Sequence, residues 1–523
     1  MLSYDDIPRQ LNLASWFVDR NVEEGRGART ALIGPGGTTT YVELAGLINK
    51  SGNVLRELGV RAEERVLLVL TDSVEFVAVW YGAQKIGAVT AEAYTFLHPK
   101  EYAYYLEYSR AGVVVADATT VDRVREAASS SRWLRRLLVV GADVDLGSRE
   151  ASFDALAAEA PDELEAAPTQ RDDIAIWKFT TGSTGPPKAA VHPQHSPVLS
   201  FDWYARGVLA MREDDLVLPV PKLFFGYARD LTALYPFGVG AAGIVFPERT
   251  TPERIFELVA RHRPSILVQV PTMMAAMTAH PDAAAQDLSS LRLCTSAGEA
   301  LPAELLERWR TAFGVDVLDG IGSSEAYHIY ISNRPGRVRP GSVGEVVPGY
   351  RARVVGEDGN EVADGELGTL WIEGDTAALM YWNEHEKTKE MFSGDVVKTG
   401  DLFVRDGDGF FWFRGRSDQL LKVGGVWVAP AEVEQCLTSH PDVVECAVVG
   451  YEEDGLTLTR AHVVLREGVA PTPELGAALQ DHVRANLSPH KYPRDVRFIM
   501  ELPKTPSGKI DRRALAGRVE AMP

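Results

Sequence analysis

Two segments of the chain, more than 300 positions apart, carry residue types suited to phosphate chemistry. Residues 180–188 combine two glycines, several hydroxyl side chains and a lysine, and residues 503–510 hold Lys509 directly after a glycine. Glycine lets a backbone turn closely around a ligand, and the exposed N–H groups of such a turn bind anions. A flexible lysine supplies a movable cation. These features predict an enzyme that joins a carboxylate to a nucleotide.

Other interpretations of the glycine-rich and histidine-bearing segments fit less well. Residues 180–188 could be a polar surface loop, but they are not a Walker loop, which needs glycine where Pro187 stands. Residues 238–243 match G-x-G-x-x-G, yet a strand-like run follows instead of a helix, so we expect no dinucleotide site there. His192 and His195 alone are too few ligands to indicate a metal site.

Before about Gly341, the apolar pattern predicts an α/β fold. Buried strands alternate with helix-like segments, and Ser73 stands where a helix N-cap is expected. The strands are expected at residues 65–70, 112–116, 137–140, 174–179 and 265–270, and the helices at residues 73–86 and 254–263. This alternation predicts mainly parallel sheets with helices on both faces.

After about Gly341 the pattern becomes that of antiparallel strands. Strands are expected at residues 350–355, 368–372 and 410–413, with a hairpin turn at 406–409 and a short polar segment at 414–419. Beyond Asp418 we expect a small α+β unit, with helices at 431–437 and 473–486 and strands at 443–449 and 460–465. The predicted domains are therefore residues 1–417, which include a distorted antiparallel β subdomain, and residues 418–523.

Composition narrows the class of protein. The chain has 523 residues, 45% hydrophobic and 24% charged, which is typical of a globular protein with two or more domains. A net charge of −19 disfavours a nucleic-acid partner. Three cysteines do not make a disulfide framework, and neither a secretory leader nor a membrane span is evident. We expect a cytoplasmic protein that does not bind membranes.

Five motifs together resemble the adenylate-forming superfamily of acyl-CoA synthetases, adenylation domains and luciferases. They are residues 180–188, 323–325, 399–401, 415–418 and 503–510, and the resemblance covers nearly the whole chain. Residues 222–227, 319–329 and 332–336 resemble the benzoate-CoA ligase branch more narrowly. The resemblance implies a large N-terminal domain, a small mobile C-terminal domain, and the use of ATP, Mg²⁺ and coenzyme A.

The resemblance also implies an ATP/AMP site. Asp401 and Arg416 would hold the ribose hydroxyls, although they could instead form a structural ion pair. Asp319 would lie beside the adenine amine, and Ser324, where the family usually has threonine, would bond the α-phosphate. The complete set is Thr181, Gly182, Ser183, Thr184, Gly185, Lys188, Gly298, Glu299, Ala300, Asp319, Gly320, Ile321, Ser324, Asp401, Phe413 and Arg416.

Four residues are implied to be catalytic: Thr180, Glu325, His328 and Lys509. Glu325 would anchor Mg²⁺, since a hard cation prefers a carboxylate oxygen; the alternative is an exposed glutamate on a turn. Lys509 would bridge the acid's carboxylate and the ribose-phosphate oxygens; the alternative is a solvated lysine near the C-terminus. His328 could face the carboxylate or have a structural role.

The family's domain rotation implies a second set of roles. Asp418 is the expected hinge, because a short residue between domains can absorb a large backbone change. The rotation would withdraw Lys509 and bring in Lys422, Gly424 and Gly425 as the coenzyme A channel, with Gly425 leaving room for the pantetheine arm. Without the resemblance, the two glycines are simply a turn.

The benzoate ligase branch implies an acid pocket rich in small residues, which suits a flat ring. Its residues are Phe225, Gly226, Tyr227, Arg229, Ala297, Gly322, His328 and Ile329. The branch usually continues after this tyrosine with Gly-Leu-Gly-Asn, whereas here residues 228–231 include Arg229 and Asp230. These two charges are either a local ion pair that faces outward or a means of recognising a polar ring substituent, such as a hydroxyl or amino group.

The predicted function is that of an ATP-dependent aryl acid–CoA ligase for a benzoate or a hydroxy- or aminobenzoate. It would proceed through an acyl-adenylate to the thioester, with release of pyrophosphate and AMP. One alternative is an aryl acid adenylating enzyme that loads the phosphopantetheine of a separate carrier protein. Another is a catalytically silent nucleotide-binding sensor. A homodimer is compatible with the resemblance.

Overall fold

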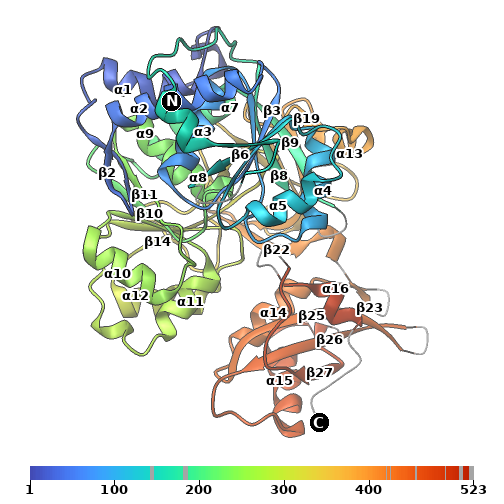
Figure 1. Cartoon of the computed structure of the whole chain (residues 1–523). Coiled ribbons are helices and arrows are strands. Elements are labelled where there is room, and N and C mark those ends of the chain that lie inside the picture. Colours follow the sequence, from blue (N-terminus) through green and yellow to red (C-terminus); the bar gives the residue numbers. More distant parts are fainter. Residues whose placement is uncertain are drawn as a thin grey trace.

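The computed structural model of the chain describes residues 1–141, 146–180, 186–419, 421–423, 426–453, 456–488, 491–505 and 510–517. Figure 1 shows a large body formed by the N-terminal and central parts of the chain and a smaller unit formed by the C-terminal part. This arrangement agrees with the predicted α/β fold. The exact boundary at Asp418 remains a prediction.

One sheet of the large body has eight strands in the order β19-β9-β8-β4-β3-β5-β6-β7. The strands are β3 (Arg65–Val69), β4 (Val89–Glu92), β5 (Val113–Asp117), β6 (Arg136–Val140), β7 (Glu150–Ser152), β8 (Ile174–Thr180), β9 (Lys188–Pro193) and β19 (Met380–Tyr381). Strands β4, β3, β5, β6 and β7 and the pair β4·β8 are parallel, while β8, β9 and β19 pair antiparallel.

A second sheet has nine strands in the order β16-β15-β14-β13-β12-β10-β11-β1-β2. They are β1 (Thr30–Gly34), β2 (Gly37–Thr40), β10 (Leu216–Pro219), β11 (Ala242–Ile244), β12 (Ile266–Gln269), β13 (Leu293–Ser296), β14 (Val317–Gly322), β15 (Ile329–Ser332) and β16 (Glu345–Val346). Pairing is parallel from β1 to β14 and antiparallel at both edges.

Helices cover both faces of these sheets. The helices of the large body are α1 (Arg20–Glu23), α2 (Tyr41–Glu57), α3 (Val74–Lys85), α4 (Pro99–Ser109), α5 (Val121–Ala128), α6 (Phe153–Glu159), α7 (His195–Ser200), α8 (Gly226–Ala233), α9 (Tyr235–Val239), α10 (Pro252–His262), α11 (Pro271–Ala279), α12 (Ala303–Phe313) and α13 (His385–Met391). Alternate residues of β3 show the layering: Leu67 packs in a core with α4 and α5, whereas Leu68 packs in a core with α2, α3 and α8. That second core also contacts the nine-stranded sheet, whose far face packs on α10, α11 and α12.

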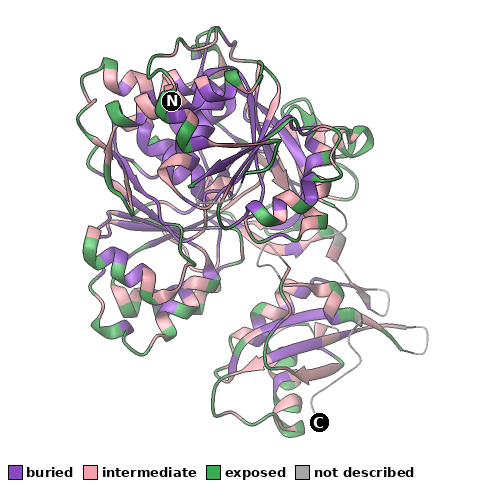
Figure 2. Cartoon of the chain, in the orientation of Figure 1, coloured by how far each residue is buried: buried purple, intermediate pink, exposed green. Residues whose placement is uncertain are grey.

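The elements before Gly341 form for the local reasons expected from the sequence. Ser73 caps α3, because its hydroxyl accepts a hydrogen bond from the N–H of Phe76. Thr251 caps α10 in the same way, and Pro252 stands at its first position. Figure 2 shows that the strands of the two sheets are largely buried, as expected for sheets covered on both faces.

A third sheet is antiparallel, as predicted. It contains β17 (Arg351–Val355), β18 (Leu367–Glu373), β20 (Phe392–Ser393), β21 (Val396–Arg405) and β22 (Phe411–Arg416). The turn at 406–409 joins β21 to β22, and Asp406 accepts hydrogen bonds from the N–H groups of Asp408 and Phe410. One expectation needs correction: residues 414–416 continue β22 because Gly415 and Arg416 pair with Leu402 and Asp401 of β21.

The smaller unit is an α+β domain, as predicted. Strands β25 (Val443–Glu453), β26 (Leu456–Leu465) and β27 (Asp495–Phe498) form one sheet, and β23 (Leu421–Val423) pairs with β24 (Val426–Val428). The helices are α14 (Pro430–Thr438), α15 (Pro473–Asn486) and α16 (Arg512–Gly517). Within the described part of the chain, no helix is long and apolar enough to span a bilayer.

Candidate active site

The predicted site residues gather where several parallel strands end. Strands β13 and β14 lie side by side and end at Ser296 and Gly322, and the loops that follow them carry Ala297 and Glu325. In open α/β sheets, ligands bind outside the carboxyl ends of the strands. Thr180 pairs with Lys188 across β8 and β9, so these two residues flank the ends of the glycine-rich segment. The topology therefore brings segments from distant parts of the sequence to one edge.

Several predictions fall outside the described residues and stay predictions. These are Thr181, Gly182, Ser183, Thr184, Gly185, Gly424, Gly425 and Lys509; the side chains of Asp418 and Lys422 are outside the description as well.

Glu325 accepts a hydrogen bond from the hydroxyl of Tyr381, with 2.6 Å between the two oxygens. The ammonium of Lys188 lies 4.6 Å from the centre of the Tyr381 ring. Burial lowers the pKa of Lys188, and Glu325 and Glu384 oppose that shift. Tyr381 comes from β19, far from Glu325 in the sequence, so it orients the carboxylate from the neighbouring sheet. No sequence motif indicated a role for Tyr381.

A single carboxylate fits what Mg²⁺ requires when a nucleotide is present. Mg²⁺ usually binds one or two carboxylates together with substrate phosphates and water. The described residues contain no group of three or more His, Cys, Asp or Glu side chains arranged to hold a metal ion. The two histidines considered above point elsewhere: His192 bonds the carbonyl of Ser324 at 2.6 Å, and His195 bonds the carbonyls of Arg171 and Asp375.

Asp401 and Arg416 face each other across β21 and β22. The guanidinium Nη1 lies 3.0 Å from Asp401 Oδ1, and it also donates to the carbonyl of Thr399 at 3.2 Å. The Arg416 side chain is 38% exposed. The ion pair considered as an alternative therefore exists. Because the Arg416 side chain is partly exposed, the pair is compatible with the ribose contacts, which stay a prediction. Phe413 pairs with Phe403 two register positions further along these strands, with 5.6 Å between the ring centres.

Asp319 ends the parallel part of β14 and is buried. Burial raises its pKa well above the ordinary value, and Oδ1 has no hydrogen-bond partner among the described residues. A buried orphan oxygen is expensive unless a ligand satisfies it. An amine donor, such as that of adenine, would suit this oxygen.

The remaining predicted nucleotide residues lie in the loops and strand ends nearby. Gly298 has φ +90°, a left-handed conformation suited to glycine. Glu299 accepts hydrogen bonds from the N–H and hydroxyl of Thr272 in α11, so its carboxylate holds a helix start, and Ala300 is exposed beside it. A side chain at Gly320 would lie 2.7 Å from a carbonyl of β15, so Gly320, with Ile321, permits close strand pairing.

The acid pocket residues lie on α8, β15 and the loops after β13 and β14. The Tyr227 hydroxyl bonds Thr295 at 2.7 Å, and the Nε2 of His328 donates to the Tyr227 carbonyl at 3.3 Å. Burial lowers the pKa of His328 to about 3, so the ring is neutral near pH 7. Ala297 and Ile329 are buried, and Phe225 packs against Tyr94 with 5.0 Å between ring centres. Gly322 lies so close to the His328 carbonyl that a side chain there would clash.

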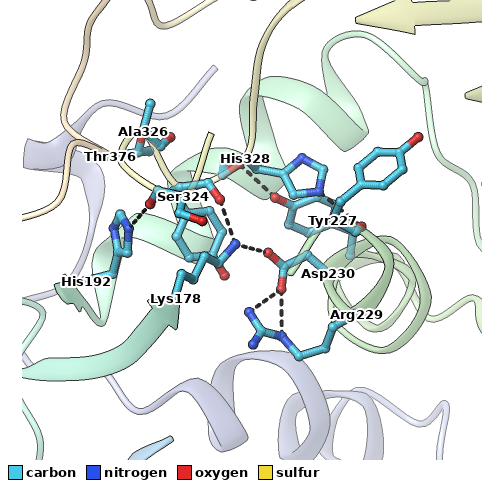
Figure 3. Close-up of polar contacts among 12 residues, drawn as sticks. Lys178, His192, Tyr227, Arg229, Asp230, Ser324, Ala326, His328 and Thr376 are labelled. Carbon is cyan, nitrogen blue, oxygen red and sulfur yellow. Dashed lines mark hydrogen bonds and ion pairs between the residues drawn. The ribbon is translucent and has the colours of Figure 1, made fainter. Parts of the chain in front are cut away.

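One prediction about this region is wrong. Arg229 and Asp230 do not face outward: their side chains are 3% and 0% exposed. Helix α8 is buried along most of its length, so a charge pair in its sequence does not mark a surface. The Arg229 guanidinium is already bonded to Asp230 and Glu92. Figure 3 shows that Lys178, which the sequence analysis did not select, reaches Asp230 from β8.

Comparison with known proteins places this site in a family. Residues 18–382 match the AMP-binding enzyme family, and residues 432–509 match the AMP-binding enzyme C-terminal domain. The chain is 42% identical to a benzoate–CoA ligase of Thauera aromatica, over 97% of this chain and 96% of that protein. The chain belongs to the AMP-binding enzyme family, in its aryl acid–CoA ligase branch.

Solved structures of the same branch agree. The crystal structure of an anthranilate CoA ligase in complex with anthranoyl-AMP superposes with a TM-score of 0.93 at 38% identity, covering 98% of each chain. A benzoate CoA ligase from Burkholderia xenovorans LB400 superposes with a TM-score of 0.89 at 40% identity, covering 97% of this chain and 100% of the other. The predicted superfamily and branch are thus confirmed. Asp418, the predicted hinge of this aryl acid–CoA ligase, lies between the two matched regions.

Proposed function

We propose that this aryl acid–CoA ligase activates a small aromatic carboxylic acid with ATP and Mg²⁺, and transfers the acyl group to coenzyme A. The packing of the predicted acid-site residues is the observation that carries the proposal. Tyr227 bonds a neutral His328, Ala297 and Ile329 are buried, and Gly226 and Gly322 have close neighbours where a side chain would begin. Small residues in this arrangement suit a flat ring, whereas a long flexible chain needs a tunnel.

In the first half-reaction, a carboxylate oxygen attacks the α-phosphorus of ATP, and pyrophosphate leaves. Two anions must approach each other, so the site has to supply positive charge and hydrogen-bond donors where negative charge accumulates. Lys188 is a described cation that is influenced electrostatically by Glu325, and Lys509 is the predicted cation that meets the reacting carboxylate. Glu325, oriented by Tyr381, would hold Mg²⁺, which when bound neutralises phosphate charge.

The geometry of the described residues supports the other nucleotide contacts that we propose. Asp401 would accept hydrogen bonds from the ribose hydroxyls while Arg416 donates to them, and Asp319 would accept from the adenine amine. Ser324 directly precedes Glu325 in the sequence. Its carbonyl accepts a hydrogen bond from His192, which holds this loop in place. In the second half-reaction, the thiol of coenzyme A attacks the acyl carbon, and AMP leaves.

A panel of acids tests this proposal. Pyrophosphate release would be measured with benzoate, its hydroxy and amino derivatives, and medium-chain aliphatic acids, with free coenzyme A or a phosphopantetheinylated carrier protein as acceptor. We expect aromatic acids to be at least about 100-fold better than aliphatic acids in kcat/KM, and free coenzyme A to yield the thioester. Turnover only with the carrier protein, or no turnover with any acid, would overturn the proposal.

A further inference from the structure

Lys178 is a buried lysine in the middle of the apolar strand β8. Its side chain is 5% exposed. Its ammonium donates to Asp230 Oδ2 and to the carbonyl of Tyr327, both at 2.6 Å, and lies 3.6 Å from the centre of the Tyr327 ring. An ammonium has three N–H donors, and among the described residues only these two oxygens accept from it. The third N–H has no oxygen acceptor among the described residues and lies beside the Tyr327 ring, so a ligand oxygen can compete with the ring for it.

The groups around Lys178 balance its charge. Arg229 donates to Asp230 Oδ1 through Nε at 3.0 Å and Nη2 at 2.8 Å, and its Nη1 lies 2.5 Å from Glu92 Oε1. Trp80 donates to the same oxygen of Glu92 at 2.6 Å. The two positive charges of Lys178 and Arg229 balance the two negative charges of Asp230 and Glu92, so the cluster has no net charge.

This balance determines what kind of ligand group the cluster can accept. An anionic ligand group would leave the buried cluster with excess negative charge, which is costly away from water. An uncharged hydrogen-bond acceptor adds no charge and uses the remaining donor. Burial opposes ionisation of Asp230, yet Arg229 and Lys178 together lower its pKa to about 2; burial lowers the pKa of Lys178 to about 8, so the ammonium is charged at neutral pH.

Lys178 lies beside Gly226, one of the predicted acid-pocket residues. A Cβ atom placed on Gly226 would lie 3.0 Å from its Nζ and 3.1 Å from its Cε, so only glycine leaves the ammonium where it is. Tyr327, whose carbonyl binds the ammonium, has φ +75°, which is unfavourable for a tyrosine. The loop therefore holds a strained residue in the position that turns its carbonyl toward Lys178. Figure 3 shows the Lys178 ammonium between this loop and Asp230 of α8.

His328 carries a second polar atom without a hydrogen-bond partner among the described residues. His328 is 4% exposed, and its Nε2 donates to the Tyr227 carbonyl, which leaves Nδ1 as an acceptor. Nδ1 has no hydrogen-bond partner among the described residues. The region thus offers one spare donor and one spare acceptor, and a hydroxyl group can use both.

We infer that Lys178 is a specificity-determining residue that donates a hydrogen bond to a hydroxyl group on the ring of the substrate. Asp230 and Arg229 are positioning residues that hold the ammonium in place. This inference rests on the proposed function and names its substrate class, a hydroxybenzoate. It also revises the role predicted for Arg229: the arginine acts through Asp230 rather than by touching the ring.

The first test uses the unaltered enzyme. The kcat/KM values for thioester formation would be measured for benzoate, for the 2-, 3- and 4-hydroxybenzoates, and for the three methylbenzoates, which match the hydroxyl in size. At one ring position we expect the hydroxy acid to exceed both the methyl acid and benzoate by about 10- to 100-fold, because a buried donor is left unpaired otherwise. If a methyl acid or benzoate equals the best hydroxy acid, the inference is wrong while the proposed function stands.

The second test removes the donor without leaving a net charge. In the double variant Lys178→Met with Asp230→Asn, one positive and one negative group are lost together. We expect the hydroxy-to-methyl ratio of kcat/KM values to fall about 10-fold or more, because the hydroxy acid loses more activity than the methyl acid or benzoate. A ratio that stays constant would show that the cluster is only structural and would overturn the inference.

Lys222→Met is a matched control. Lys222 is a partly buried lysine whose pKa is lowered to about 8 by burial, and its Nζ donates to the Phe246 carbonyl and lies 3.5 Å from the Phe246 ring. It should change stability without changing the ratio. If no aromatic acid is converted by the unaltered enzyme, the proposed function itself fails, and the inference fails with it.

Discussion

Two groups of ion pairs in the large body have the same chemistry and opposite surroundings. The cluster of Lys178, Asp230, Arg229 and Glu92 has side chains between 0% and 5% exposed. The pair of Arg416 and Asp401 lies at the rim of the antiparallel sheet, with the arginine 38% exposed. A buried charge depends on its partner, while an exposed pair adds little stability but can exchange its partner for a ligand. Under the proposal, the buried cluster holds residues beside the acid site in place, and the exposed pair contacts the nucleotide.

The largest effect on the free energy of unfolding is expected from changes in the buried cluster. Asp230→Ala leaves two cationic side chains buried without their shared carboxylate, so we expect a loss of about 3–5 kcal/mol in the free energy of unfolding. Urea denaturation followed by fluorescence measures it. Asp364→Ala is the control, since it removes an exposed partner of Arg405 and should cost under about 1 kcal/mol. Equal effects of the two variants would contradict the proposed difference.

The second-largest effect on stability is expected on acidification, which should destabilise the buried region around His192. Burial lowers the pKa of His192 from its ordinary value of 6.5 to about 3. Because the folded pKa is below the unfolded one, the stability that this neutral histidine contributes is complete above pH 6.5 and is lost as the pH falls toward 3. At pH 5 we expect a loss of about 2 kcal/mol from this residue.

Denaturation at pH 7 and pH 5 for the unaltered protein and for His192→Gln tests this effect. The variant should lose less stability on acidification by that amount, because glutamine does not titrate. The bond from residue 192 to the Ser324 carbonyl can still form from the amide. Identical losses in both proteins would exclude His192 as a source of acid sensitivity.

The smallest effect on stability is expected on the exposed side. Arg416→Ala should cost under about 1 kcal/mol in unfolding free energy, because water already solvates the guanidinium in part. It should nevertheless raise the KM for ATP about 10-fold or more, while the KM for the acid changes much less. A large loss of stability with an unchanged KM for ATP would show that the pair is structural.

Much of the fold was predictable because local signals agreed with the tertiary structure. Helix α15 has the predicted bounds, since Thr472 caps it and Pro473 begins it. Helix α3 was placed by Ser73. The antiparallel strands followed from alternation and from the turn at Asp406. In each case the deciding residues lie within a few positions of one another.

The parts that could not be predicted depend on distant contacts. Residues 414–416 were expected to be part of a short polar segment, because a charged residue such as Arg416 gives no local sign of strand pairing with Asp401. Arg229 and Asp230 looked like a surface pair because Lys178 and Glu92, which neutralise them, lie on other elements. The only local sign was a lysine in the apolar run of β8. Tyr381 reaches Glu325 across two sheets, and no pattern near either residue indicates that contact.

The central claim is that the chain makes an aryl-adenylate with a movable lysine and then a thioester. It is tested most directly by single-turnover measurements on the unaltered enzyme and on Lys509→Ala, with an aromatic acid and ATP in one series and a preformed aryl-adenylate with coenzyme A in the other. We expect the variant to form the adenylate at least about 100-fold more slowly, yet to make the thioester from the preformed adenylate at nearly the unaltered rate. Adenylate formation at the same rate in both proteins would contradict the account.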